Sequence, residues 1–196
     1  MKLCFATNNK NKIVEVNELI PDHIQLLSLS DIGHTADLEE SQPTIEGNAR
    51  QKAQFIYEQY HVNCFADDTG LEVEALNNEP GVYSARYAGP QRSDDDNIAL
   101  LLQNLKSGKN RKAQFKTVIS AFINGKEYAF EGLAKGEITS EKTGTSGFGY
   151  DPIFKPQGFD LTFAEMSLSQ KNQISHRAKA VRKFAEFVSR NFQKLD

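Results

Sequence analysis

Two adjacent carboxylates, Asp67 and Asp68, follow the apolar run Val62–Ala66 and precede Thr69 and Gly70. The run is typical of the end of a buried strand, so we expect the pair at the carboxyl end of that strand. Neighbouring carboxylates repel each other unless positive charge lies beside them, and a hard cation such as Mg²⁺ would relieve the repulsion. Ligands of open α/β sheets bind beside this end of the strands. The pair therefore indicates a metal or ligand site, and the alternative is a solvated turn.

A polar loop, Thr7–Lys12, connects the apolar run Leu3–Ala6 to a helix whose apolar residues, among them Ile13 and Val16, recur at helical spacing. A loop that ends at a helix N-terminus can bind phosphate. Two of its lysines lie in or near the first turn, where the helix dipole disfavours cations, and an anionic ligand would offset that cost. The loop lacks the glycines of a Walker A or dinucleotide motif. An ordinary solvated loop is the alternative.

Glu39 and Glu40 lie in an acidic loop, a pattern that usually marks solvated surface. Thr44 follows and is a suitable N-cap for a second helix. On that helix, Asn48 and Lys52 are one turn apart, so their side chains face the same side.

The last third of the chain contains a glycine-rich loop and a basic helix start. The loop, Thr143–Pro152, carries two aromatic residues and an acid, but its Gly-x-Gly lacks the third glycine of a dinucleotide motif. Ser175 opens a helix whose first half is rich in Arg and Lys, against the helix dipole. A solvated face accounts for the later cations. Arg177, beside His176, instead indicates an anionic or carbonyl-bearing ligand, with a surface ion pair as the alternative.

The remaining patterns predict an α/β fold with a mixed sheet. The expected elements are strands over Ile24–Leu29, Phe115–Ile123, Glu127–Glu131 and Leu133–Ile138, a helix from Ser93 that Gly108 ends, and a short strand or edge at Pro152–Phe154. Asn124 and Gly125 join two of these β-rich runs and predict a hairpin. Asp94, Asp95 and Asp96 suit a helix N-terminus, so we interpret them as structural rather than as metal ligands.

Composition narrows the class of protein further. The chain has 196 residues, 39% of them hydrophobic and 25% charged, with a net charge of −3, which is typical of a globular protein without a basic field for nucleic acid. No apolar run approaches the length of a membrane span, and the first residues lack the pattern of a signal peptide. Cys4 and Cys64 both lie in apolar runs, so we expect core thiols in a reducing compartment, the cytoplasm.

Five motifs together resemble the inosine triphosphate pyrophosphatase family, in family order and from the first strand to the last helix. They are Thr7-Asn8-Asn9-Lys10-Asn11-Lys12, Ala66-Asp67-Asp68-Thr69-Gly70-Leu71, Pro80-Gly81-Val82-Tyr83-Ser84-Ala85-Arg86-Tyr87, Gly147-Phe148-Gly149-Tyr150-Asp151-Pro152-Ile153-Phe154 and Ser175-His176-Arg177. The first motif departs from the family, which often has Thr-Gly-Asn where this chain has Thr7-Asn8-Asn9. Asparagine tolerates the left-handed conformation, so the loop can still form.

The resemblance implies a single α/β domain over residues 1–196. It implies a long mixed β-sheet flanked by helices, two lobes around a deep nucleotide cleft, and a homodimer. The implied reaction is the Mg²⁺-dependent conversion of a purine nucleoside triphosphate (ITP, dITP or XTP) to the monophosphate and pyrophosphate.

The resemblance also implies roles for individual residues. Thr7, Asn8, Asn9, Lys10, Asn11 and Lys12 would hold phosphate together with Lys52, and Thr69 would touch the substrate. Phe148, Gly149, Tyr150, Asp151, Lys171, His176 and Arg177 would line the nucleotide site. Asp68 would be both metal ligand and proton acceptor, and either Glu39 or Glu40 would supply the second metal carboxylate.

The chemistry of these residues suits that reaction. Lysines and a metal offset the charge of a triphosphate, and a purine can stack on Phe148. Donors from His176 or Arg177 would pair with the six-carbonyl of hypoxanthine or xanthine but stay unpaired against the amino group of adenine, which can discriminate by roughly 10⁴-fold. A less selective nucleotide pyrophosphatase and a non-catalytic nucleotide sensor are the alternatives, and the second has no need of a metal–water site.

Overall fold

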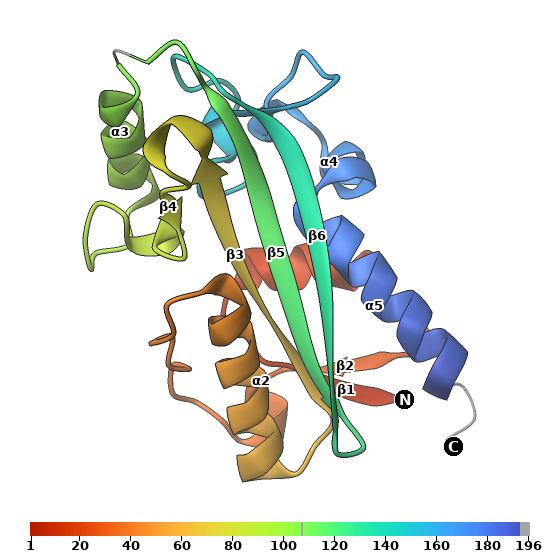
Figure 1. Cartoon of the computed structure of the whole chain (residues 1–196). Helices are drawn as coiled ribbons and strands as arrows, with labels where there is room; N and C mark the ends of the chain where they lie inside the picture. Colours follow the sequence, from red (N-terminus) through yellow and green to blue (C-terminus); the bar gives the residue numbers. More distant parts are fainter. Residues whose placement is uncertain (107, 193–196) are drawn as a thin grey trace. The chain divides into compact units, whose positions relative to one another are not determined.

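The computed structural model describes residues 1–106 and 108–192, and its β-strands form one mixed sheet (Figure 1). The strands are β1 (Lys2–Phe5), β2 (Gln25–Leu27), β3 (Cys64–Val73), β4 (Pro80–Gly81), β5 (Lys112–Ile123), β6 (Lys126–Ile138) and β7 (Phe154–Pro156). Their order is β2-β1-β3-β5-β6-β7, with β4 beside β3. β1 runs parallel to β2 and β3, whereas β4 and β7 pair antiparallel with β3 and β6. The predicted α/β fold with a mixed sheet is confirmed.

The described helices are α1 (Lys10–Asn17), α2 (Ile45–Tyr60), α3 (Asp94–Asn104), α4 (Leu168–Ile174) and α5 (His176–Phe192). The chain divides into two compact units. Unit 1 comprises Met1–Asp68, Thr117–Gly132 and the chain from Arg177 on, and unit 2 comprises Thr69–Lys116 and Leu133–His176. The single domain over residues 1–196 and the cleft between two lobes stay predictions.

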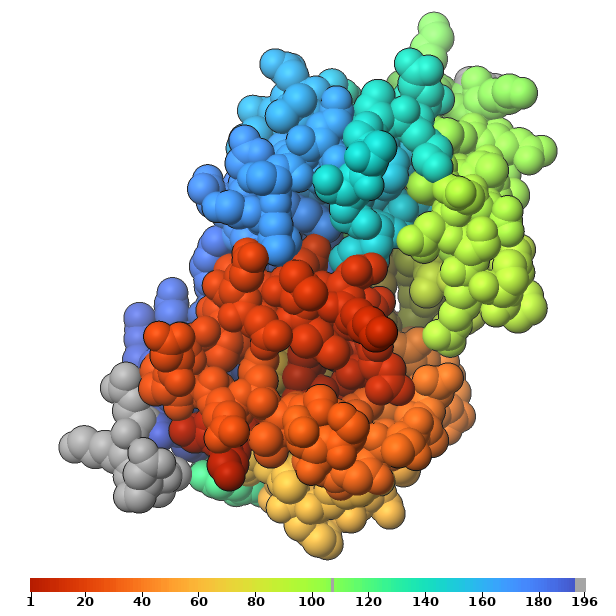
Figure 2. Space-filling view, turned by 180° about the vertical axis from the view of Figure 1, so that it is seen from behind, coloured from red at the N-terminus to blue at the C-terminus, as the bar shows by residue number. Residues whose placement is uncertain are grey.

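Unit 1 is built around the two faces of β1 and β3. On one face, Phe65 stacks on Phe5 at 4.6 Å between ring centroids and packs against Phe184 of α5 at 4.7 Å. On the other face, the small residues Cys64 and Ala66 join the buried cluster that includes α2. Because consecutive residues of a strand point to opposite faces, β3 serves both clusters at once. Figure 2 shows the N-terminal part of unit 1 in red and orange.

Unit 2 has its own buried core. Ile98 and Leu101 of α3 pack with Phe115 of β5 and Phe154 of β7 in one cluster. Each such fully buried side chain contributes roughly 1.5–3 kcal/mol relative to exposure, so α3 is firmly attached to the sheet of this unit.

Local signals placed two helix starts and one turn correctly. The Thr44 side chain accepts a hydrogen bond from the Gly47 amide at the start of α2, and Ser93 caps α3 in the same way. Asn124 and Gly125 have φ values of 51° and 79°, which fit the type I′ turn expected between β5 and β6.

Three predictions of elements were wrong, and one helix was missed. The helix α3 ends at Asn104, before the predicted end at Gly108. β3 does not end before Asp67 and Asp68 but continues through both to Val73. Leu133–Ile138 is no separate strand, because β6 runs without interruption. The helix α4 had no counterpart among the expected elements.

The two cysteines are free and buried, as expected. Burial raises the pKa of the Cys4 thiol to about 11 and that of Cys64 to about 12. Among the described helices, none has both the length and the apolar character that a membrane crossing requires.

Candidate active site

The polar loop before α1 is organised around Asn9. Its side chain caps α1 by accepting hydrogen bonds from the amides of Asn11 and Lys12, at 3.0 and 3.2 Å, and Thr7 accepts one from the Asn9 amide. The Asn8 side chain donates to the Ala36 carbonyl at 3.3 Å. The helix starts with no acidic residue in its first turn, so its positive end is available to an anion.

Asp67 lies at the centre of a buried ion-pair network in unit 1. Lys12 Nζ lies 2.9 Å from one carboxylate oxygen and Arg177 Nε lies 3.0 Å from the other. Arg177 also pairs through Nη1 with Glu15 of α1. Arg177, Asp67 and Glu15 are only 1%, 2% and 4% exposed. Burial alone would raise the pKa of Asp67, but the charges of Lys12 and Arg177 hold it well below its ordinary value.

Asp68 contacts a different set of residues on α2. The Asn48 side-chain amide donates to Asp68 Oδ2 at 3.2 Å, and Lys52 Nζ lies 4.0 Å from Asp68 Oδ1. The same ammonium lies 2.6 Å from Glu40 Oε1 and donates to the Asp67 carbonyl at 2.8 Å. Burial lowers the pKa of Lys52, but the charges of Asp68 and Glu40 outweigh it and the net shift is upward.

The position of the pair inside a strand explains how two adjacent carboxylates coexist. Successive strand residues point to opposite faces, so Asp67 meets α1 and α5 whereas Asp68 meets α2. Each carboxylate therefore has its own cation, and the expected mutual repulsion is relieved without a turn. Asn48 and Lys52, which helical spacing placed on one side, both reach Asp68.

The donor set around Lys52 fits a hard divalent cation. Glu40 and Asp68 both direct carboxylate oxygens at one positive group, and Glu40 is partly buried whereas Glu39 is exposed. Among residues 1–106 and 108–192, no group of three or more His, Cys, Asp or Glu side chains could hold a metal ion. A cation such as Mg²⁺ needs only one or two protein carboxylates when water and substrate phosphates complete its shell.

In unit 2, the glycine-rich loop and α4 form a second polar group. Asp151 Oδ2 accepts the Phe148 amide at 2.9 Å and pairs with Lys171 Nζ at 2.6 Å. The same ammonium lies 5.1 Å from the centroid of the Phe148 ring, a cation–π distance. Gly147 has a φ of +76°, and a Cβ there would lie 2.1 Å from the Asp151 carboxylate, so the turn requires glycine.

Three more of the predicted site residues lie in less polar surroundings in unit 2, namely Tyr150, His176 and Thr69. The Tyr150 hydroxyl donates to the Ser84 carbonyl at 2.9 Å, and burial is the largest cause of its raised pKa. The His176 ring stacks on Phe115 at 4.5 Å between centroids. Thr69 is half-buried on β3. In unit 1, the predicted phosphate-binding residue Lys10 is exposed at the start of α1.

Sequence reasoning missed Glu15 and left the role of Asp67 open. Glu15 lies three residues after Lys12, a helical spacing that places both side chains on one side of α1. The sequence did contain a signal for this contact, because Glu15 is an acidic residue directly beside the buried Val16 of α1.

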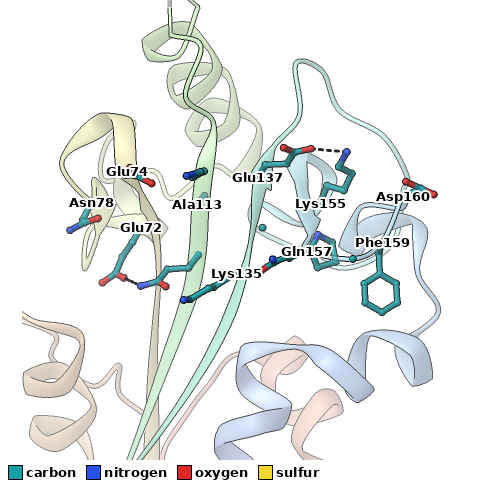
Figure 3. A pocket seen from close by; sticks show the side chains of 15 residues that line it. Glu72, Glu74, Asn78, Ala113, Lys135, Glu137, Lys155, Gln157, Phe159 and Asp160 are labelled. Atoms are coloured by element: carbon teal, nitrogen blue, oxygen red, sulfur yellow. Dashed lines mark hydrogen bonds and ion pairs between the residues drawn. The ribbon is translucent and has the colours of Figure 1, made fainter.

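A groove of about 760 Å³ lies elsewhere in unit 2 (Figure 3). Its lining includes Glu72, which accepts a hydrogen bond from Gln114 at 2.7 Å, and the ion pair of Lys155 with Glu137 at 2.7 Å. None of its lining residues belongs to the motifs singled out for chemistry.

The fold and these groups define an α/β protein with two carboxylates and several buried cations around one strand. The profile of the Ham1 family matches residues 3–187. A dITP/XTP pyrophosphatase of Flavobacterium johnsoniae is 58% identical over 189 residues, which cover 96% of this chain and 98% of that protein. One from Porphyromonas gingivalis is 48% identical over 188 residues, which cover 95% and 97%.

Solved structures agree with these relatives. The Ham1 protein of Staphylococcus aureus has a TM-score of 0.88 at 41% identity, with 96% of this chain and 98% of that chain covered. A HAM1 protein from Coxiella burnetii has a TM-score of 0.90 at 34% identity, with 97% and 99% covered. The chain belongs to the Ham1 family.

Proposed function

We propose that this protein hydrolyses non-standard purine nucleoside triphosphates, namely ITP, dITP and XTP, to the monophosphate and pyrophosphate. The observation that carries the proposal is the arrangement around Lys52, where Glu40 and Asp68 converge on one cation beside the partly buried Lys12. The names of the relatives, dITP/XTP pyrophosphatases, support the choice of substrate.

The loop before α1 and the cations near Asp68 supply groups for the triphosphate. The loop from Thr7 to Lys12 offers the amide-rich start of α1 and its lysines to the phosphates, and Lys52 adds a further cation. Glu40 and Asp68 would hold Mg²⁺, which would neutralise phosphate charge and polarise the phosphoryl oxygens. The structure favours Glu40 over Glu39 for this role because only Glu40 contacts Lys52.

Asp68 accepts the proton of the attacking water. The water oxygen forms a bond to the α-phosphorus, the bond from this phosphorus to the bridging oxygen breaks, and pyrophosphate leaves. A carboxylate near such a water is a competent general base. Asn48 donates to one oxygen of Asp68 and so fixes the orientation of the other.

The glycine-rich loop and α4 supply groups for the base. Phe148 offers an aromatic face for the purine, and the Lys171 ammonium, which Asp151 holds, lies over the same ring. We keep Thr69, Gly149, Tyr150 and His176 among the substrate-binding residues. Arg177 stays in this proposal as well, although its observed contacts with Asp67 and Glu15 give it a positioning role.

We further propose a homodimer in the cytoplasm. The dimer rests on the resemblance described above, and the compartment rests on two buried free thiols.

The test is pyrophosphate release from ITP, ATP and dUTP by the wild-type protein with and without Mg²⁺. We expect ITP turnover that requires the metal and exceeds ATP turnover by several orders of magnitude. Turnover of dUTP as fast as ITP would favour a less selective pyrophosphatase. ITP binding without turnover would favour a nucleotide sensor, in which case the assignment of Glu40 and Asp68 would be wrong.

A further inference from the structure

The Phe148–Asp151 segment forms a tight turn. The Phe148 carbonyl accepts a hydrogen bond from the Asp151 amide at 3.2 Å. Gly149 has a φ of +60°, and Tyr150 has a φ of −89° and a ψ of 9°. These values fit a type II′ turn, in which the second residue needs a positive φ and is usually glycine. The Gly149 amide takes no part in the hydrogen bond that closes the turn.

Asp94 supplies the acceptor for that amide. Its Oδ2 atom lies 2.7 Å from the Gly149 nitrogen, a distance typical of a charge-assisted hydrogen bond. Asp94 is the first residue of α3, and the buried Ile98 and Leu101 anchor this helix in the core of unit 2. The turn is therefore attached to a rigid element.

The neighbouring aspartates of α3 have other partners. Asp95 pairs with Lys142 at 2.6 Å on the surface, and Asp96 accepts a hydrogen bond from Gln91 at 3.2 Å. Of the three acids in this first turn, Asp94 is the one that contacts the glycine-rich loop.

The turn carries the groups assigned to the base. Phe148 is its first residue and Asp151 its last, and Asp151 holds both the Phe148 amide and Lys171. The peptide unit between Phe148 and Gly149 is planar. An acceptor that fixes the direction of the Gly149 N–H bond therefore fixes the whole peptide plane. This plane in turn restricts the orientation of the Phe148 residue attached to it.

We propose that Asp94 is a positioning residue for recognition of the purine base. Its carboxylate fixes the Phe148–Gly149 peptide and, through it, the aromatic face and the Asp151–Lys171 pair. The inference rests on the proposed function and goes beyond it, because helix-start acids of this kind are otherwise explained by the helix dipole alone. If Asp94 only stabilised the N-terminus of α3, Asp95 would contribute in the same way. Positioning of the Phe148–Gly149 peptide, in contrast, would belong to Asp94 only.

The experiment compares Asp94→Asn with Asp95→Asn. Both variants remove one negative charge from the first turn of α3, so both change the helix dipole interaction alike. Steady-state kinetics with ITP and with ATP, together with thermal unfolding, are measured for both variants and the wild type. For Asp94→Asn, we expect kcat/KM for ITP to fall by about tenfold, mainly through KM, and that for ATP to fall less. The reason is that the Lys171 ammonium, which Asp151 holds, can donate to the six-carbonyl of hypoxanthine but not to the amino group of adenine. For Asp95→Asn, we expect an unchanged ITP/ATP ratio.

An equal ITP/ATP ratio in the two variants would overturn the inference, as would an Asp94→Asn loss that falls entirely on kcat. If Asp94→Asn does not fold, Asp94→Glu replaces it under the same criterion, since it keeps the charge but moves the acceptor by one methylene group. Failure of the proposed function is distinguishable, because the wild-type protein would then release no pyrophosphate from ITP.

Discussion

The guanidinium of Arg177 lies 3.0 Å from the carboxylate of Asp67, although 110 residues separate the two in the chain. This ion pair, together with that between Arg177 and Glu15, joins the start of α5 to β3 and α1 within unit 1. These two ion pairs explain how α5 can begin with a cation. The unfavourable interaction of Arg177 with the helix dipole is small compared with its attraction to two carboxylates. The sequence had instead suggested a ligand for this residue.

Arg177→Ala should destabilise the fold by about 3–5 kcal/mol, because it removes the cation from the buried Glu15 and from one of the two oxygens of Asp67, whose other oxygen keeps Lys12. Urea unfolding measures this change. The control is Arg190→Ala on the same helix, where an exposed pair with Glu186 at 3.6 Å contributes no more than about 1 kcal/mol. Similar losses for both variants would contradict a central role for the buried network.

The same Arg177 variant separates positioning from base recognition. Because the observed contacts of Arg177 are with carboxylates, we expect Arg177→Ala to lower kcat/KM for ITP and ATP by similar factors. Two-substrate kinetics on folded protein decide the matter. A fall of the ITP/ATP ratio by about tenfold to a hundredfold, roughly 1.4–3 kcal/mol of differential binding, would show that Arg177 reads the six-carbonyl after all.

Asp67 should make stability depend on pH in the acid range. Its folded pKa lies below its unfolded pKa, which is about 3.9 for Asp. The stabilisation is therefore present above the unfolded pKa and is lost as the pH falls through the folded pKa. We expect the free energy of unfolding to decrease from about pH 4 downward, and Asp67→Asn to remove part of this slope. Denaturant unfolding of the wild type and of Asp67→Asn between about pH 2 and pH 6 measures it, and identical slopes for the two would contradict this role of Asp67.

Asp68→Asn should affect activity far more than stability. It removes charge from the metal site and the proton acceptor together, so turnover of ITP should fall by about 10²–10⁴-fold. Melting temperature and ITP turnover at saturating Mg²⁺ are measured on the same preparation. Near wild-type turnover would remove Asp68 from the centre of the mechanism.

Glu40→Gln and Glu39→Gln form a matched pair that identifies the second metal carboxylate. We expect Glu40→Gln to raise the Mg²⁺ concentration for half-maximal activity by about tenfold or more, and Glu39→Gln to leave it unchanged. A titration of activity with Mg²⁺ measures both. The reverse result would assign the metal to Glu39, the exposed neighbour.

The homodimer is tested by light scattering at micromolar concentration. We expect a mass close to twice the 21.9 kDa of one chain. A mass near that of the single chain would contradict the dimer, without bearing on the assignment of the reaction.

Much of the local structure followed from the sequence by itself. Thr44 and Ser93 marked helix starts because their hydroxyls satisfy amides that the first turn leaves without partners. Asn124 and Gly125 marked a hairpin because both tolerate a positive φ. The resemblance of five motifs, in family order, also sufficed to predict the family. These features depend on near neighbours in the chain.

Only the tertiary structure decided how the charges are arranged. Asp67 and Asp68 lie inside β3, since cations from α1, α2 and α5 neutralise them on opposite faces. Glu15 reaches Arg177 across 162 residues of sequence, and no local pattern carries such a contact. A buried charge is stable only where a partner lies within a few ångströms. The sequence shows which residues are charged, but the packing of distant segments determines which of them meet.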